Sequence, residues 1–141
     1  MRIVDYEADF YAWANQQAEL LRQQQGNNLD WMNLAEEIEA MGRSEKRQLA
    51  NRLEVLIMHL LKWHYQPNFR SRGWQLTIQE QRLRLGKLLQ ENPSLKPMVA
   101  EIILSVYPLA VISAERETGL SNYPEDCPYS PEQLLSDLFL P

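Results

Sequence analysis

The chain has 141 residues, of which 45% are hydrophobic and 23% are charged, and its formal net charge is −5. This length and composition suit one folded domain with a sizeable core, and they exclude a disordered chain. The one cysteine, Cys127, excludes an internal disulfide and a cysteine-based zinc site, so nothing in the composition points to secretion.

The charges are unevenly distributed along the chain. Residues 1–42 carry two basic and eight acidic side chains, and residues 115–141 carry one basic and six acidic side chains. Between them, residues 62–87 carry six basic side chains and one acidic side chain. We interpret this pattern as complementarity between packed helices or as solvated helix faces, because net charge alone says little about partners.

The sequence predicts a soluble cytoplasmic protein. Its first ten residues include acidic side chains and lack an apolar stretch, which is not the pattern of a signal peptide. The longest apolar stretch, residues 99–114, contains Glu101 and Pro108. It is shorter than the roughly 20 residues that a membrane-spanning helix needs.

Helical periodicity begins close to the N-terminus. Apolar residues recur at helical spacing from Asp5 to about residue 24, which predicts a first helix over this range. Asp5 is the expected N-cap, because a short polar side chain there can accept a hydrogen bond from the first helical turn. Gly26 is expected to end the segment.

A second helix is expected over about residues 30–66. Leu34, Ile38 and Met41 form one apolar face near its start, and a longer apolar stripe follows in the second half. Gly42 lies between these two parts. It either breaks the helix or only weakens it, by roughly 1 kcal/mol relative to alanine.

Two further long helices are predicted. The third covers residues 74–91 and has apolar residues along one face. The fourth covers residues 95–118 and is apolar almost all round, which suits a central helix. Ser94 is its expected N-cap, and Pro108 is expected to kink it because proline removes a backbone donor.

The segment SPEQLL predicts a short last helix. Ser130 is a suitable N-cap, Pro131 fits the first helical position, and Gln133 completes a capping box. No segment shows the convincing alternation of a β-strand. The sequence therefore predicts one all-α domain over residues 1–141, a compact bundle of about five helices joined by short loops.

Five stretches carry a family resemblance: YEADFYAWANQQAELLR, LDWMNLAEEIEAMGRSEKRQL, HLLKW, RSRGWQLTIQEQR and CPYSPEQLLSDLFLP. In these stretches the chain resembles the mainly cyanobacterial family called domain of unknown function 29, over nearly its whole length. The resemblance implies an all-helical fold with no established activity, cofactor or ligand. At the position of His64 the family commonly has glutamine, so the resemblance does not imply a two-histidine site.

The two histidines of the chain are not placed as a chelating pair. His59 and His64 are five residues apart, so their side chains lie about 140° apart around a helix axis. Neither belongs to the Glu-x-x-His motif of metal sites in helical bundles. We therefore predict no metal site and no cofactor, and we expect His59 to be a hydrogen-bonded histidine in the core or at its boundary.

Several ionisable side chains lie on helices that are mostly apolar and form a candidate polar cluster: Glu36, Glu39, His59, Lys62 and Arg82. If they face inward they must pair, because an unpaired buried charge is costly. We predict at least one ion pair between the EEIE segment, residues 36–39, and a basic residue of the 62–87 region. The alternative is a set of solvated surface pairs, each worth less than about 1 kcal/mol.

A second group of side chains forms a candidate basic face: Arg70, Arg72, Arg84 and Lys87. Together with the neighbouring Trp74, such a face could contact nucleic-acid phosphates. The protein is acidic overall, with a pI of about 5.1, and it has no recognised nucleic-acid-binding motif. Nucleic-acid binding is therefore an alternative and not the main prediction.

No sequence motif indicates an enzyme, since the five glycines form no phosphate-binding loop and no GxSxG motif is present. The aromatic first helix and the apolar tail LLSDLFLP would offer a contact patch to a protein partner or a second copy if they are exposed. We therefore predict a helical interaction or regulatory module. The alternatives are a nucleic-acid-associated or antitoxin-like accessory protein, and a metal- or small-ligand-binding bundle around His59.

Overall fold

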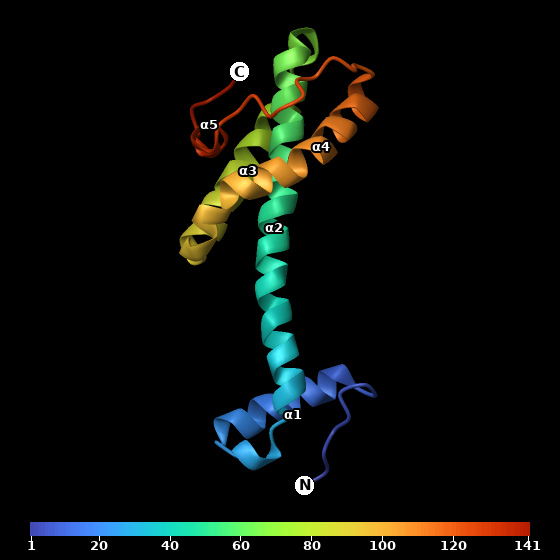
Figure 1. The fold of residues 1–141 in the computed structure, drawn as a ribbon, viewed down its shortest axis with the longest axis vertical. Helices are drawn as coiled ribbons and strands as arrows, with labels where there is room; N and C mark the ends of the chain where they lie inside the picture. Colours follow the sequence, from blue (N-terminus) through green and yellow to red (C-terminus); the bar gives the residue numbers. More distant parts are fainter. The chain divides into compact units, whose positions relative to one another are not determined.

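The computed structural model describes residues 1–141 and contains α-helices and short 3₁₀ turns but no β-strand. The predicted all-α class is confirmed. The chain divides into two compact units: unit 1 is Met1–Ser44 and unit 2 is Glu45–Pro141. The helices are α1 (Phe10–Arg22), α2 (Trp31–Tyr65), α3 (Arg72–Glu91), α4 (Val99–Thr118) and α5 (Pro131–Leu135), as drawn in Figure 1.

Unit 1 consists of the N-terminal residues, α1 and the first part of α2. Asp9 caps α1 by accepting a hydrogen bond from the Ala12 N–H. The predicted start at Asp5 is therefore wrong, because Asp5 closes a turn ahead of the helix. The indole N–H of the buried Trp13 donates to Asp30 at 3.0 Å, which ties α1 to the residue before α2.

α2 is a single helix of 35 residues. It continues through Gly42, so the glycine weakens the helix without breaking it. The second half of α2 carries a stripe of fully buried residues, whereas the part before residue 49 has none. The stripe consists of Leu49, Leu53, Leu56, Ile57, Leu60 and Leu61.

Unit 2 has one hydrophobic core, to which α2, α3, α4 and α5 all contribute. Figure 1 shows α3 and α4 lying against the later part of α2, with α5 beside α3. One face of α4 is buried in this core, while Leu104, Leu109 and Ile112 on its other side are exposed. The stretch Pro93–Thr118 is long and apolar enough to cross a membrane by length and composition alone, a property it shares with the core helices of folded domains.

Two further predicted helix starts are wrong. Ser71 caps α3 by accepting from the Trp74 N–H at 3.1 Å, so the helix begins at Arg72 and not at residue 74. Residues Pro93–Met98 form a 3₁₀ turn, and Ser94 lies inside it without capping α4. Tight turns of this kind often precede an α-helix and satisfy its first backbone groups.

The later helix ends follow the expected local chemistry. α4 continues through Pro108, and the kink expected there stays a prediction. The helix α4 ends at Gly119, whose φ of +76° lies in the left-handed region that glycine tolerates. The capping box of α5 is confirmed, because the Ser130 hydroxyl accepts from the Gln133 N–H while the Gln133 side chain accepts from the Ser130 N–H.

Candidate functional site

A buried lysine is the central polar residue of unit 2. Lys62, on α2, is 7% exposed. Its Nζ lies 2.5 Å from Oε2 of Glu117 in the last turns of α4, and 4.6 Å from the centre of the Trp74 ring on α3. A carboxylate and an aromatic face thus replace the water that the ammonium loses on burial. This contact joins three helices around one charge.

His59 lies one turn before Lys62 on α2 and is half-buried. Its Nδ1–H donates to the Val55 carbonyl at 2.9 Å, a hydrogen bond within the same helix. Burial lowers the pKa of His59, and the Lys62 ammonium acts in the same direction. The second histidine, His64, has a separate partner, since its Nδ1 lies 3.1 Å from the Tyr129 hydroxyl. No group of three or more His, Cys, Asp or Glu side chains is placed to hold a metal ion.

The structure brings together only part of the predicted polar cluster. His59 and Lys62 are neighbours, whereas Glu36 and Glu39 are exposed residues of unit 1. Glu39 pairs with Arg43 one turn further along α2, at 3.6 Å. Lys62 pairs with Glu117 of α4 inside unit 2, and the ion pair predicted between the acidic segment and a basic residue of the central region stays a prediction.

Sequence reasoning missed Glu117, the partner of Lys62. It stands in the segment AERET at the end of α4, where charged side chains ordinarily face solvent. Its side chain is 48% exposed, and the hydrogen bond from Lys62 lowers the pKa of its carboxyl group. The only sequence signal was an acidic residue after a long apolar helix, which is too common to identify an ion pair.

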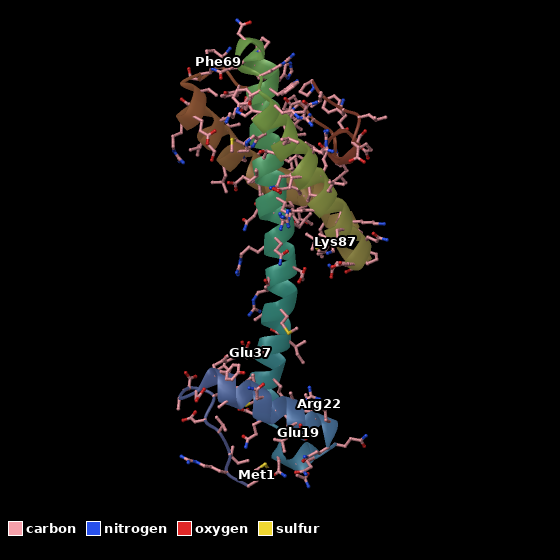
Figure 2. All side chains as sticks on the ribbon, turned by 180° about the vertical axis from the view of Figure 1, so that it is seen from behind. Met1, Glu19, Arg22, Glu37, Phe69 and Lys87 are labelled. Carbon is pink, nitrogen blue, oxygen red and sulfur yellow. The ribbon has the colours of Figure 1, made fainter.

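The EEIE segment makes its main contact inside unit 1. The Tyr6 hydroxyl donates a hydrogen bond to the carboxylate of Glu37 (labelled in Figure 2). This hydrogen bond raises the pKa of Tyr6 to about 12. The Tyr6 ring packs edge-on against Trp13, with ring centres 4.8 Å apart. These contacts hold the N-terminal residues against the start of α2.

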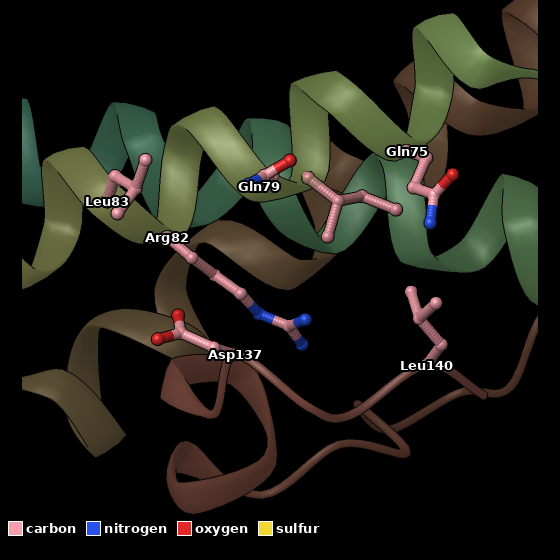
Figure 3. Close-up of a pocket in the computed structure, with 7 residues that line it drawn as sticks. Gln75, Gln79, Arg82, Leu83, Asp137 and Leu140 are labelled. Atoms are coloured by element: carbon pink, nitrogen blue, oxygen red, sulfur yellow. The ribbon is translucent and has the colours of Figure 1, made fainter.

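Arg82, on α3, anchors the C-terminal segment and does not pair with a glutamate. It is 6% exposed, and its guanidinium donates to the backbone carbonyls of Leu134 at 2.9 Å and Gln133 at 3.1 Å. It also lines a cavity of about 340 Å³ between α3 and the C-terminal segment (Figure 3). The other lining residues are Gln75, Ile78, Gln79, Leu83, Asp137 and Leu140.

The four residues of the predicted basic face lie at the two ends of α3. Arg70 and Arg72 lie at its start, and Arg84 and Lys87 lie about 18 Å or more further along the axis. Arg84 and Lys87, the latter labelled in Figure 2, each pair with a glutamate one turn away at 4.0 Å. The Arg70 guanidinium donates to the Trp63 carbonyl, and the Arg72 guanidinium donates to the Gln75 side chain. These side chains therefore have local acceptors and are not gathered into one patch.

An exposed apolar surface lies on the part of α2 that belongs to unit 1. We define the α2 apolar face as Trp31, Leu34, Ile38 and Met41, which recur every three or four residues and so share one side of the helix. Trp31 is 64% exposed, and Ile38 and Met41 are each 67% exposed, whereas Leu34 is half-buried. Single exposed apolar residues are ordinary, whereas a contiguous set on one helix face marks an interaction surface.

The two contact surfaces predicted from the sequence, the first helix and the C-terminal tail, are partly exposed. On α1, Phe10 and Tyr11 are exposed, whereas Trp13 is buried. In the C-terminal tail, Leu138 is exposed, whereas Phe139 packs against the core of unit 2. Both segments therefore use part of their apolar surface to close their own unit.

These observations define an all-α protein whose buried polar side chains hold its helices together and whose second helix leaves an apolar face uncovered. The chain belongs to the family described as Domain of unknown function DUF29, whose model matches residues 6–140. The family resemblance seen in the sequence is thereby confirmed. No curated protein and no solved structure matches the chain.

Proposed function

We propose that this protein is an interaction module that binds a second copy of itself through the α2 apolar face. The observation that carries the proposal is the exposure of Ile38 and Met41, each 67%, on a helix whose later part is buried in a core. A helix with an apolar stripe normally covers that stripe with another element. The uncovered part of α2 is therefore the surface where we expect a partner.

The spacing of the face supports a helix–helix contact. Trp31, Leu34, Ile38 and Met41 follow the alternating intervals of three and four residues that core positions of coiled coils have. Fully burying one such side chain is worth about 1.5–3 kcal/mol. Two copies contribute six exposed side chains of this face, from Trp31, Ile38 and Met41. The free energy of burying them is of the same order as the roughly 4–15 kcal/mol that association costs in lost freedom of motion.

The charges of the chain support a second copy as the occupant. Residues 1–42 contain two basic and eight acidic side chains, whereas residues 43–52 contain four basic side chains and one acidic side chain. On α2 itself, three acidic residues, Glu36, Glu37 and Glu39, are followed by the basic residues Arg43, Lys46, Arg47 and Arg52. A surface of this kind can be complementary to itself, as a two-fold symmetric interface requires.

The alternative functions have less support. The residues of the candidate basic face are engaged with local acceptors. Lys62 and Arg82 make contacts that join helices or chain segments, and the His59 ring bonds within its own helix. No observation in the fold favours a nucleic-acid partner or a ligand at His59 over self-association.

Sedimentation velocity over a range of protein concentrations tests the proposal. The wild-type protein is expected to form a dimer at the higher concentrations. The double variant Ile38→Glu/Met41→Glu is expected to remain monomeric, because unpaired carboxylates are costly to bury in an apolar contact. The control is Leu104→Glu, which adds one carboxylate at an exposed apolar residue of α4 and is expected to dimerise like the wild type.

Two results would contradict the proposal. The first is a wild-type protein that stays monomeric at every concentration. The second is a dimer that persists in Ile38→Glu/Met41→Glu but is lost in Leu104→Glu, because the interface would then lie on α4. Circular dichroism of each variant shows whether the helical fold is retained.

A further inference from the structure

Arg82 is a buried charge without a carboxylate partner. It is 6% exposed, and the ion pairs of the chain all involve other side chains. Its Nε–H donates to the Leu134 carbonyl and its Nη2 to the Gln133 carbonyl, whereas Nη1 makes no hydrogen bond within the chain. Because a buried charge is costly without a full counter-charge, and backbone carbonyls carry only partial charges, the guanidinium retains the capacity to bind an anion.

The Arg82 guanidinium lies at the cavity between α3 and the C-terminal segment. Figure 3 shows its side chain reaching from α3 toward that segment, which contributes Asp137 and Leu140 to the opposite wall. The cavity volume of about 340 Å³ lies near the lower end of the range of small-molecule sites. Side chains on one side of α3 supply the rest of the lining, two amides and two apolar groups: Gln75, Gln79, Ile78 and Leu83.

The lining defines the class of ligand. Burial lowers the pKa of Arg82, and the Asp137 carboxylate opposes this effect only in part, so a second negative charge is favourable there. Asp137 repels a dianion such as phosphate more strongly than a monoanion. A planar carboxylate matches the guanidinium, and the apolar walls match an organic group.

We propose that this cavity binds a small organic acid, with its carboxylate on Arg82 and its apolar part against Leu83 and Leu140. The site is separate from the proposed self-association, because all its lining residues belong to unit 2 and none to the α2 apolar face. Loss of one activity therefore leaves the other in place.

NMR titration of the ¹⁵N-labelled full chain with phenylacetate tests the site. The Arg82 Nε–H signal and the backbone amides of residues 75–83 are expected to shift and saturate, with a dissociation constant in the millimolar range for so small a ligand. Phenylacetamide keeps the ring but lacks the charge, and it is expected to bind at least about tenfold more weakly. Acetate keeps the carboxylate but lacks the ring, and it is also expected to bind more weakly.

Two variants test the ligand class while retaining the hydrogen bonds of Arg82. Asp137→Asn removes a like charge from the cavity and is expected to lower the dissociation constant of phenylacetate roughly two- to fivefold. Its matched control is Glu132→Gln, which removes the same charge from α5 outside this cavity. Leu83→Gln removes part of the apolar wall and is expected to raise the dissociation constant, whereas Leu104→Gln, at an exposed residue of α4, is expected to leave it unchanged.

Three results would overturn the assignment of this site. The first is a titration in which the signals of residues 75–83 do not shift or do not saturate. The second is equal affinity for phenylacetate and phenylacetamide, or for phenylacetate and acetate. The third is an Asp137→Asn variant that binds phenylacetate no more tightly than Glu132→Gln does.

Discussion

The Lys62 ammonium and the Glu117 carboxylate join α2 to α4 across 55 residues of sequence, with Nζ and Oε2 2.5 Å apart. The two partners differ in their access to water, since Lys62 is buried and the Glu117 side chain is half exposed. If Lys62 is removed, Glu117 can be hydrated. If the Glu117 charge is removed, the Lys62 ammonium stays buried with only the Trp74 ring beside it.

This asymmetry predicts unequal effects of two substitutions. Glu117→Gln leaves a buried charge without its counter-ion and is expected to lower the free energy of unfolding by about 1–3 kcal/mol. Lys62→Met removes the charge and keeps an apolar stem of similar size, so the expected change is less than about 1 kcal/mol. Urea denaturation of the two variants measures both values. A larger loss in Lys62→Met than in Glu117→Gln would contradict this description of the pair.

The stability of the protein is expected to fall as the pH drops below 6.5, through His59. Burial and the Lys62 ammonium hold the pKa of the folded-state imidazole below its ordinary value of 6.5. Between these two pKa values the unfolded chain binds a proton that the folded chain does not, so protonation favours unfolding. The loss begins near pH 6.5 and levels off below the folded-state pKa.

Denaturation midpoints measured across this pH range test the role of His59. His59→Gln removes the titrating ring, and its stability is expected to change less between pH 7 and the folded-state pKa than that of the wild type. Equal pH dependence of the two proteins in this window would show that another group is responsible.

Arg82 is expected to hold the C-terminal segment in place. Arg82→Lys cannot donate to the Leu134 and Gln133 carbonyls in the forked geometry of a guanidinium, so we expect a loss of about 1–3 kcal/mol and faster hydrogen exchange in residues 130–141. Arg84→Lys is the matched control, because Arg84 is exposed and makes only a surface ion pair. Unchanged exchange of residues 130–141 in Arg82→Lys would rule out this anchoring role.

Gly42→Ala is expected to affect the single chain and the dimer in opposite directions. The added methyl group meets no atom of the same copy, so helix propensity should stabilise α2 by up to roughly 1 kcal/mol. The same methyl group adds bulk beside Met41 of the α2 apolar face and should weaken the proposed self-association. Thermal unfolding at low concentration and sedimentation at high concentration measure the two effects. An unchanged dissociation constant would argue against close packing at Gly42.

Local features of the fold could be predicted from the sequence, because they depend on neighbours along the chain. The helical class follows from apolar periodicity, and the capping box follows from Ser130 and Gln133 alone. The start of α1 could not be predicted in this way, because Asp5 and Asp9 are equally suitable caps. The choice of Asp9 is consistent with a tertiary contact, in which the Tyr6 hydroxyl reaches Glu37 on α2.

The partners of the polar side chains depend on how helices pack, and residue type alone does not reveal that. Lys62 was a candidate for an ion pair, but the choice of Glu117 over the EEIE segment requires the placement of α4 against α2. Likewise, the spacing of Leu34, Ile38 and Met41 predicts an apolar face without saying what covers it. Because Ile38 and Met41 are exposed in the structure, the α2 apolar face is a candidate interface.

The most direct test of self-association through the α2 apolar face is hydrogen exchange of the wild-type protein at low and high protein concentration. We expect the backbone amides of residues 31–44 to become more protected as the concentration rises, because the dimer covers them and suppresses local opening of this part of α2. The buried stripe of unit 2, residues 49–61, should change little. Exchange of residues 31–44 that is the same at every concentration, or new protection confined to α4, would contradict the account.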